Sequence, residues 1–429
     1  METGSRLLEA EDSEPAATRL VDRLLAQCTT LDASDLHLAP SLPPYFRVHG
    51  VLRPCGEFPG LSADLLDAIA AELARRCGRP PLGDIGSLDG AITSPGGRRF
   101  RFNAFRRQNQ TSIALRRLDE RFRSLAELGL REDLYDLCNL PDGLVVVAGP
   151  TGAGKSTTLA TLIDRINSDR ASHIVTIEDP IEYLHVPRRS LVNQRQVGSD
   201  AESFYEALVA SLRQDPDVVL VGEIRDLNTI RTAITAAETG HLVFTTVHAG
   251  DCVGAIERLV SVFPADEQQG IRRQLSLVLR CILAQHLLVC DGALSKRTID
   301  GAQGDAGAIA SEMDEPAPQG RLGAAASLTE RGRSAPMRRQ RVAASEVLMV
   351  NAAVANLIAT GKSSQIYSAL ETGGPQGMHT LEEDLARLWR RGHLSEQSAL
   401  AMARNPAVVR ERYLNGRNSP QSAASGGRS

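Results

Sequence analysis

The segment GPTGAGKS at residues 149–156 constrains this chain more than any other, because it matches the pattern GxxxxGK[ST] at every defined position. Apolar residues 144–148 lead directly into it, and residues 157–166 have the apolar spacing of a helix. Glycines let successive backbone N–H groups converge on phosphate oxygens, and the start of a helix adds partial positive charge. The sequence therefore predicts a strand, a phosphate-binding loop and a helix that together hold a nucleoside triphosphate.

The residue types in this loop have defined chemical roles. We expect the ammonium of Lys155 to contact the β- and γ-phosphates and the hydroxyl of Ser156 to ligate Mg²⁺. The chain has only two other lysines, Lys296 and Lys362, and takes nearly all its positive charge from arginine. A planar guanidinium would not fit such a loop, which explains a lysine here. The expected nucleotide-binding residues are Gly149, Pro150, Thr151, Gly152, Ala153, Gly154, Lys155, Ser156 and Thr157.

Another apolar run, residues 218–221, is followed by Gly222 and then Glu223. Ligands of doubly wound sheets bind at the carboxyl ends of the strands, so Glu223 is placed to orient and deprotonate an attacking water. Many phosphate-loop proteins have a magnesium-associated aspartate where this chain has Gly222. The metal therefore needs a second carboxylate from elsewhere.

The run 174–177 supplies candidates, because it ends in Glu178, Asp179 and Glu182. Pro180 is expected to end the strand, which leaves these acids near the same sheet edge. Some of them are expected to hold Mg²⁺ through water; the alternative for each is a solvated turn or a helix cap.

Histidine and arginine side chains complete the candidate site. The run 242–247 is flanked by His241 and His248, and a histidine at a strand end can contact the γ-phosphate. Residues 99–105 alternate so that Arg99 and Arg101 share one face of a strand. The spacing alone predicts that this face of the strand is exposed to solvent. Phosphoryl transfer nevertheless benefits from an arginine that another domain or subunit inserts into the nucleotide site.

Length and composition predict a multidomain cytoplasmic protein. The 429 residues suggest two or three domains, and a net charge of −4 argues against a nucleic-acid partner. The seven cysteines contain no CxxC pair, and no apolar run reaches the about 18 residues of a membrane span. The expected segments are a disordered leader 1–16, an α+β domain 17–118, a linker 119–142, an α/β domain 143–407 with a flexible insertion 292–340, and a disordered tail 408–429.

Four motifs in this order resemble those of the secretion ATPase superfamily, and most closely the twitching-motility, PilT-type retraction ATPases of type IV pili. They are GPTGAGKSTT, TIEDPIE, DPDVVLVGEIRD and TGHLVFTTVHA. Further matches are ASDLHL, LPPYFRVHG, RFRFNAF, LVNQRQV and QIYSALETGG, so the resemblance covers residues 17–290 and 342–405.

The resemblance implies a smaller α+β PAS-like N-terminal domain and a RecA-like α/β phosphate-loop ATPase domain. It implies a homo-hexameric ring that hydrolyses ATP with Mg²⁺ between the two domains and rotates one against the other. The implied location is cytoplasmic, peripherally associated with the inner membrane through a platform protein of a pilus or secretion machine, with a sister ATPase as a further candidate partner.

Site residues also follow from the resemblance. The γ-phosphate arginines of the family fall on Arg101 and Arg116, and its catalytic glutamate falls on Glu223. Its acidic box falls on Glu178 and Glu182, and its histidine box on His248. The expected catalytic set is completed by Lys155, and the expected metal ligands are Ser156, Glu178 and Glu223, partly through water.

Two departures bear on the biological output. The tetracysteine zinc module of pilus-extension relatives is absent, and residues 352–360 keep the Asn-Leu-Ile core of the retraction motif AIRNLIRE without its arginines and acid. The main expectation is a pilus retraction motor or a related secretion motor. The alternatives are an accessory paralogue of the retraction motor, a conjugation or type IV secretion traffic ATPase, and an interaction protein that binds ATP without useful turnover. A nucleic-acid translocase is a further alternative, which the resemblance disfavours.

Overall fold

The computed structural model describes residues 15–118, 121–292 and 341–417. Nearly all of the expected leader and of the expected insertion lies outside the described residues. The chain divides into two compact units, Met1–Leu287 with Ser345–Thr380 and Leu288–Ala344 with Leu381–Ser429. The last helices belong to the second of these units, and the expected domain boundaries stay a prediction.

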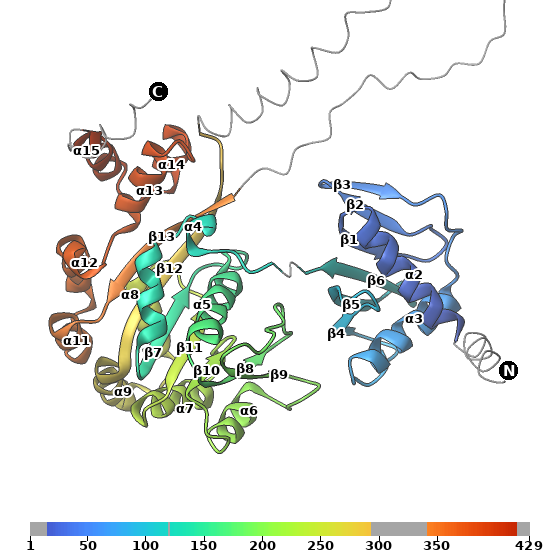
Figure 1. Ribbon diagram of the computed structural model, residues 1–429, viewed down its shortest axis with the longest axis horizontal. Helices are drawn as coiled ribbons and strands as arrows, with labels where there is room; N and C mark the ends of the chain where they lie inside the picture. Colours follow the sequence, from blue (N-terminus) through green and yellow to red (C-terminus); the bar gives the residue numbers. More distant parts are fainter. Residues whose placement is uncertain (1–14, 119–120, 293–340, 418–429) are drawn as a thin grey trace, which may run out of the picture. The chain divides into compact units, whose positions relative to one another are not determined.

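The N-terminal module is an antiparallel sheet accompanied by two helices (Figure 1). Its core contains Phe46, Phe100 and Phe102, and the Ser62 side chain caps α3 by accepting a hydrogen bond from Leu65 N–H. The six strands follow the order β3-β2-β1-β6-β5-β4. The elements are α2 (Ala16–Thr30), β1 (Ala33–Leu38), β2 (Tyr45–Val48), β3 (Val51–Pro54), α3 (Ala63–Arg76), β4 (Ser87–Thr93), β5 (Arg99–Arg107) and β6 (Gln110–Arg117). The expected α+β class is confirmed, and the PAS-like designation stays a prediction.

The second sheet has seven strands in the order β13-β12-β7-β11-β10-β8-β9. The described pairings from β12 to β9 are all parallel, and β7, β10 and β11 are buried along their whole length. Strands buried on both faces need apolar, β-branched residues throughout, which is the pattern of these runs. The strands are β7 (Gly143–Ala148), β8 (His173–Glu178), β9 (Leu191–Gln196), β10 (Val218–Val221), β11 (Leu242–Val247), β12 (Leu279–Val289) and β13 (Arg341–Met349).

The register of these strands decides where the functional loops lie. Ala148, the last residue of β7, pairs with Val247 of β11 and with Ala284 of β12. On β10, Val221 pairs with Ile177 of β8. The segments that follow β7, β8, β10 and β11 therefore leave the sheet along one edge.

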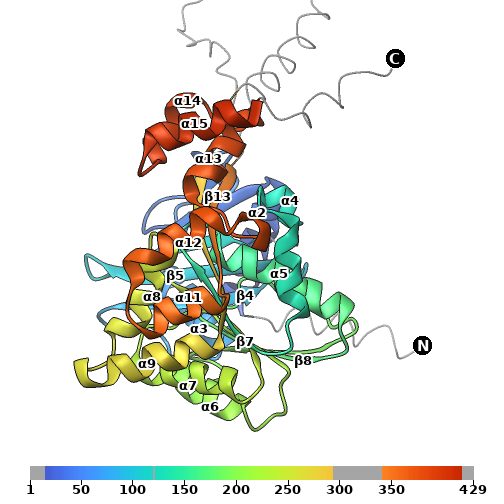
Figure 2. The same cartoon turned by 90° about the vertical axis from the view of Figure 1, so that its left-hand side faces the viewer.

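Helices accompany this sheet, and α11 packs against α9 (Figure 2). Two short elements inside the expected linker, α4 and η2, contact α5 and bury Leu125 and Leu134, so this segment is more than a connection. The elements are α4 (Leu125–Leu128), η2 (Glu132–Asn139), α5 (Lys155–Asp169), α6 (Phe204–Ser211), α7 (Leu227–Glu238), α8 (Cys252–Ser261), α9 (Ala265–Val278), α11 (Ala352–Ala359), η3 (Ser363–Gln365), α12 (Ile366–Thr372) and η4 (Gly374–Gln376).

The second unit corrects the expectation of a disordered tail from residue 408. It contains α13 (Leu381–Arg390), α14 (Glu396–Met402) and α15 (Pro406–Arg417). Val409 is fully buried, and the ring of Tyr413 stacks on Trp389 with centroids 3.7 Å apart. These tertiary contacts order a segment whose own composition is polar. Residues 418–429 lie outside the described residues.

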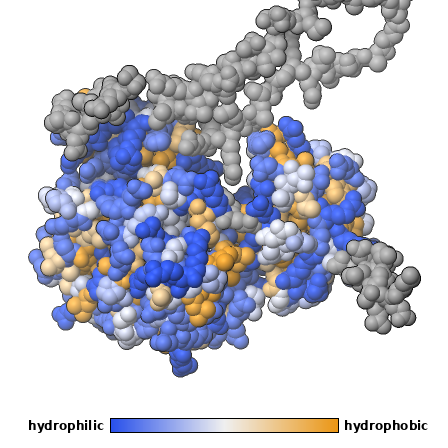
Figure 3. All heavy atoms as spheres, viewed as in Figure 1, coloured by the Kyte–Doolittle hydropathy of each residue, from blue (hydrophilic) through white to orange (hydrophobic). Residues whose placement is uncertain are grey.

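Hydrophilic residues dominate the face of the molecule in Figure 3, with hydrophobic residues in small groups. Within the described ranges, no helix combines the length and the apolar character that crossing a membrane requires.

Candidate functional site

The phosphate loop joins β7 to α5, as the sequence predicts. Gly149 is required because a Cβ there would stand 2.4 Å from the carbonyl oxygen of Gln285. Gly154 has φ +91°, in the left-handed region that favours glycine, and it begins α5 as its N-cap. The loop therefore has the backbone that the glycine spacing predicts.

The side chain of Lys155 is buried and folds back on its own loop. Its Nζ donates to the carbonyl oxygens of Gly149, at 2.9 Å, and Pro150, at 3.1 Å. Burial lowers the pKa of this ammonium, and the charge of Glu223 partly opposes that effect. Phosphate oxygens are better acceptors for a buried cation than carbonyl groups, so an incoming triphosphate can take over these bonds.

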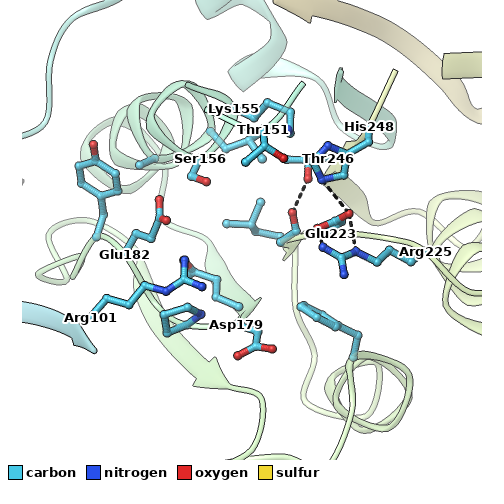
Figure 4. A pocket seen from close by; sticks show the side chains of 18 of the residues that line it. Arg101, Thr151, Lys155, Ser156, Asp179, Glu182, Glu223, Arg225, Thr246 and His248 are labelled. Carbon is cyan, nitrogen blue, oxygen red and sulfur yellow. Dashed lines mark hydrogen bonds and ion pairs between the residues drawn. The ribbon is translucent and has the colours of Figure 1, made fainter. Parts of the chain in front are cut away.

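Glu223 follows β10 and contacts the side chains of Arg225 and His248. Its Oε1 is 2.5 Å from Arg225 Nε and 3.1 Å from His248 Nε2, and its Oε2 accepts from Arg225 Nη2 at 2.6 Å. Figure 4 shows these side chains meeting at one end of the pocket. Burial would raise the pKa of Glu223, but the hydrogen bond and charge of Arg225, with His248 and Lys155, lower it overall. The carboxylate is therefore held ionised.

The two histidines next to β11 lie at opposite ends of that strand. His248 follows the strand and contacts Glu223, whereas His241 precedes it and contacts the carbonyl of Ala236 at 2.9 Å. Thr246, two positions before His248 on β11, donates from Oγ1 to the carbonyl oxygen of Gly222 at 2.6 Å. This hydrogen bond joins the end of β11 to the segment that carries Glu223. Of the two, only His248 reaches the site.

The acidic segment after β8 divides into two kinds of carboxylate. Glu178 Oε1 accepts from Thr176 Oγ1 at 2.7 Å and from Gln194 Nε2 at 3.1 Å. Burial raises the pKa of Glu178 although these hydrogen bonds oppose it. Glu182 and Asp179 line the same pocket, with Asp179 exposed. The pocket therefore holds one carboxylate with a raised pKa, Glu178, and one with a lowered pKa, Glu223.

The two arginines named by the resemblance differ in their surroundings. Arg101 on β5 and Arg116 on β6 are direct cross-strand neighbours. Arg101 lines the pocket, whereas Arg116 does not and instead donates from Nε to Asp35 Oδ1 at 2.8 Å. Within this single chain, one arginine of the pair is therefore placed at the site.

The groups that reach the site line a cavity of about 520 Å³ (Figure 4). Nine of the expected catalytic and nucleotide-binding residues contribute to its wall: Arg101, Thr151, Gly152, Lys155, Ser156, Glu178, Glu182, Glu223 and His248. The remaining loop residues, Gly149, Pro150, Ala153, Gly154 and Thr157, shape the loop from outside that wall.

Sequence reasoning missed two polar residues that act on these groups. Arg225 lies two positions after Glu223, inside the GEIRD segment, so its proximity to the carboxylate is a local signal. Gln285 is buried on β12 and contacts the phosphate loop. Its signal is weaker, namely a polar residue that interrupts an apolar strand.

The oxygen donors of the pocket fit a hard cation. In residues 15–118, 121–292 and 341–417, no three His, Cys, Asp or Glu side chains group closely enough to form a metal site. Mg²⁺ in nucleotide sites commonly takes one or two protein oxygens and completes its shell with phosphates and water. The hydroxyl of Ser156 and the carboxylates of Glu178 and Glu223 all line the pocket and are donors of this kind.

Comparison with known proteins agrees with this site. The family described as Type II/IV secretion system protein matches residues 9–387. The type IV pilus retraction ATPase PilT of Pseudomonas aeruginosa is 38% identical over 90% of this chain and 98% of its own length. A twitching motility protein of Neisseria gonorrhoeae is 36% identical over 84% of this chain and 84% of its own length.

A solved structure extends the comparison to the fold. The crystal structure of the pilus retraction motor PilT with bound ADP aligns with a TM-score of 0.72 and 33% identity, and covers 91% of this chain and 99% of that chain. Sequence and fold thus agree over the parts that form the phosphate loop and its pocket. The chain therefore belongs to the Type II/IV secretion system protein family and is a PilT-like ATPase.

Proposed function

We propose that the chain is the ATP-hydrolysing, homo-hexameric motor of a type IV pilus, and that it drives pilus retraction. The observation that carries the proposal is the cavity shared by Lys155 of the loop, Glu223 after β10 and Arg101 of the N-terminal module. Such a cavity can link the presence of ATP or ADP to the relative position of the N-terminal module and the ATPase domain. The motor acts in the cytoplasm on a platform protein of the inner membrane.

The expected catalytic and metal-binding residues that line the pocket have proposed tasks. Lys155 and the loop amides hold the β- and γ-phosphates, and Ser156 with Glu178 and Glu223 holds Mg²⁺, partly through water. Mg²⁺, when bound, neutralises charge on these phosphates. Glu223 orients the attacking water and accepts its proton, and Arg101 stabilises negative charge on the transferred phosphoryl group. His248 and Glu182 complete the polar wall around that group.

The test combines a purified protein with cells. The full-length protein should hydrolyse ATP in the presence of Mg²⁺ and have the native mass of six subunits. A strain without the gene should assemble pili and fail to retract them until the wild-type gene is restored. Absence of hydrolysis would remove the ATPase role, whereas hydrolysis together with normal retraction in the deleted strain would remove the pilus role alone.

A second candidate is an accessory paralogue of the retraction motor or a conjugation or type IV secretion traffic ATPase. The specific observation is α11, where AAVANLIA replaces the charged retraction motif. An accessory motor would support retraction only while its sister ATPase is present. Retraction assays in strains that have this gene, the sister gene or both distinguish the two candidates.

A further inference from the structure

Gln285 is a buried polar residue on β12 that uses both ends of its side-chain amide. Only 2% of its surface is exposed. Its Nε2 donates to the carbonyl oxygen of Ala153 at 2.7 Å, and its Oε1 accepts from Thr158 Oγ1 at 2.8 Å. Ala153 lies in the phosphate loop and Thr158 in the first turns of α5. One amide therefore joins the loop, the helix and the strand.

The backbone of Gln285 is also in contact with the loop. Its carbonyl oxygen occupies the position that a side chain at Gly149 would need, 2.4 Å from the ideal Cβ. Its Nε2 lies 2.9 Å from the ideal Cβ position of Gly154. The backbone of Gln285 thus excludes a side chain at Gly149, whereas at Gly154 the positive φ already favours glycine.

The hydrogen bond to Ala153 has a directional consequence. In a trans peptide the C=O and the following N–H point in opposite directions. A bond that holds the Ala153 carbonyl toward β12 therefore turns the N–H of Gly154 away from β12. The phosphate loop binds anions through backbone N–H groups that converge on one side, so the orientation of this peptide matters for phosphate binding.

We propose that Gln285 is a positioning residue of the ATPase site, which sets the shape of the phosphate loop and thereby its affinity for nucleotide. Gln285 is not among the residues that line the nucleotide cavity, so it acts through Ala153 and Thr158. A glutamine suits this place because its amide is both a donor and an acceptor. Glutamate would present an oxygen to the Ala153 carbonyl, and methionine would bond to neither partner.

The inference rests on nucleotide binding by the loop, and its test uses ADP as the probe. ADP affinity and steady-state ATP hydrolysis are measured for the full-length wild type, Gln285→Met, Gln285→Glu and Thr158→Val. We expect Gln285→Met to raise both the Kd for ADP and the KM for ATP about tenfold, equivalent to about 1.4 kcal/mol. The kcat should stay within about twofold, because a positioning residue of the ground state does not contact the reacting atoms.

The partner variants separate the two bonds. Thr158→Val removes the Oγ1 donor and should raise the Kd for ADP by a smaller factor, and Thr158→Ser should restore the wild-type value. Adding Thr158→Val to Gln285→Met should change little, because that bond is already lost. If Gln285→Met fails to fold, Thr158→Val and Thr158→Ser still test the proposal.

Asn167 provides a matched control on the same helix. It is fully buried near the other end of α5, donates to the Val186 carbonyl at 2.8 Å and accepts from the Arg188 N–H at 3.0 Å. Asn167→Leu therefore removes an equally buried, doubly bonded amide away from the loop. It should lower the melting temperature as Gln285→Met does, and leave the Kd for ADP unchanged.

Three outcomes would overturn the proposal. Wild-type Kd and KM in Gln285→Met would make its hydrogen bonds structural only. A loss of kcat at unchanged Kd would make the residue catalytic rather than positioning. An equal rise of Kd in Asn167→Leu would trace the effect to general destabilisation. If the wild type itself binds no ADP, nucleotide binding fails, and the result is distinct from all three.

Discussion

The carboxylate of Glu223 forms a bidentate ion pair with Arg225, with Oε1 to Nε at 2.5 Å and Oε2 to Nη2 at 2.6 Å. Nε2 of His248 lies 3.1 Å from the same Oε1. Both oxygens of the proposed general base are therefore engaged by the Arg225 guanidinium. Each carboxylate oxygen has two lone-pair sites, so a water can still donate its proton to Oε2 beside Arg225.

Replacing the base should separate binding from hydrolysis. Glu223→Gln keeps the shape of the side chain and removes its ability to accept a proton, so kcat should fall by about 10²- to 10⁴-fold. The Kd for ADP should change little, because the loop and Lys155 are intact. Single-turnover hydrolysis and ADP titration measure the two quantities. Wild-type turnover in this variant would remove Glu223 from the catalytic role.

Arg225 should control the acid side of the pH–rate profile. Arg225 lowers the pKa of Glu223, so the ionised base persists to lower pH in the wild type. In Arg225→Gln that influence is lost, the pKa of Glu223 rises, and the acid limb of kcat should move to higher pH.

Arg231→Gln is the control for this profile, because it removes another partly exposed arginine, one that pairs with Glu267 away from the pocket. Its acid limb should coincide with that of the wild type. The test is the pH dependence of kcat, measured for the wild type and both variants over the pH range in which each protein stays folded. An unmoved limb in Arg225→Gln would show that a group other than Glu223 determines it.

Lys155 should be indispensable among the lysines. Lys155→Ala removes the buried ammonium that faces the loop carbonyls, and hydrolysis should fall about 10²- to 10³-fold, as for loss of another preorganised charge donor. Lys155→Arg should not rescue it, because a guanidinium is larger and planar. ADP at 100 times the wild-type Kd stabilises the wild type by about 2.7 kcal/mol, and this shift should vanish in both variants. Lys362→Ala serves as the control and should retain the full shift.

The two neighbouring arginines should differ in their effect. Arg101 lines the cavity, so Arg101→Ala should lower kcat by about 10³-fold while the Kd for ADP changes little. Arg116 is paired with Asp35, so Arg116→Ala should cost less in kcat. Rates measured side by side test this difference. Equal losses would place both arginines at the phosphates in the working ring, which is the role that the family resemblance implies.

The phosphate loop and the strands before each functional segment are local features, and they were predictable for that reason. Apolar, β-branched runs ended by glycine, acid or histidine occur at 144–148, 218–221 and 242–247, and all three are strands. The strands β12 and β13 are also apolar runs, and they are neighbours in the sheet.

The error in the expected tail has a non-local cause. The tail from residue 408 reads as disordered because it is polar, yet α15 forms where Val409 is buried and Tyr413 stacks on Trp389. This result cannot be read from the composition of the tail, because the partners of α15 lie outside that segment.

The sequence by itself determined the chemistry of the site: a lysine and serine in a glycine loop, and acids and a histidine after strands. These depend on residues that are neighbours along the chain. The tertiary structure alone decided which of two adjacent arginines lines the pocket, since Asp35, 81 positions away, engages Arg116. It also placed Gln285 against Ala153 across 132 positions, because the parallel register pairs Ala148, the last residue of β7, with Ala284, the residue before Gln285 on β12.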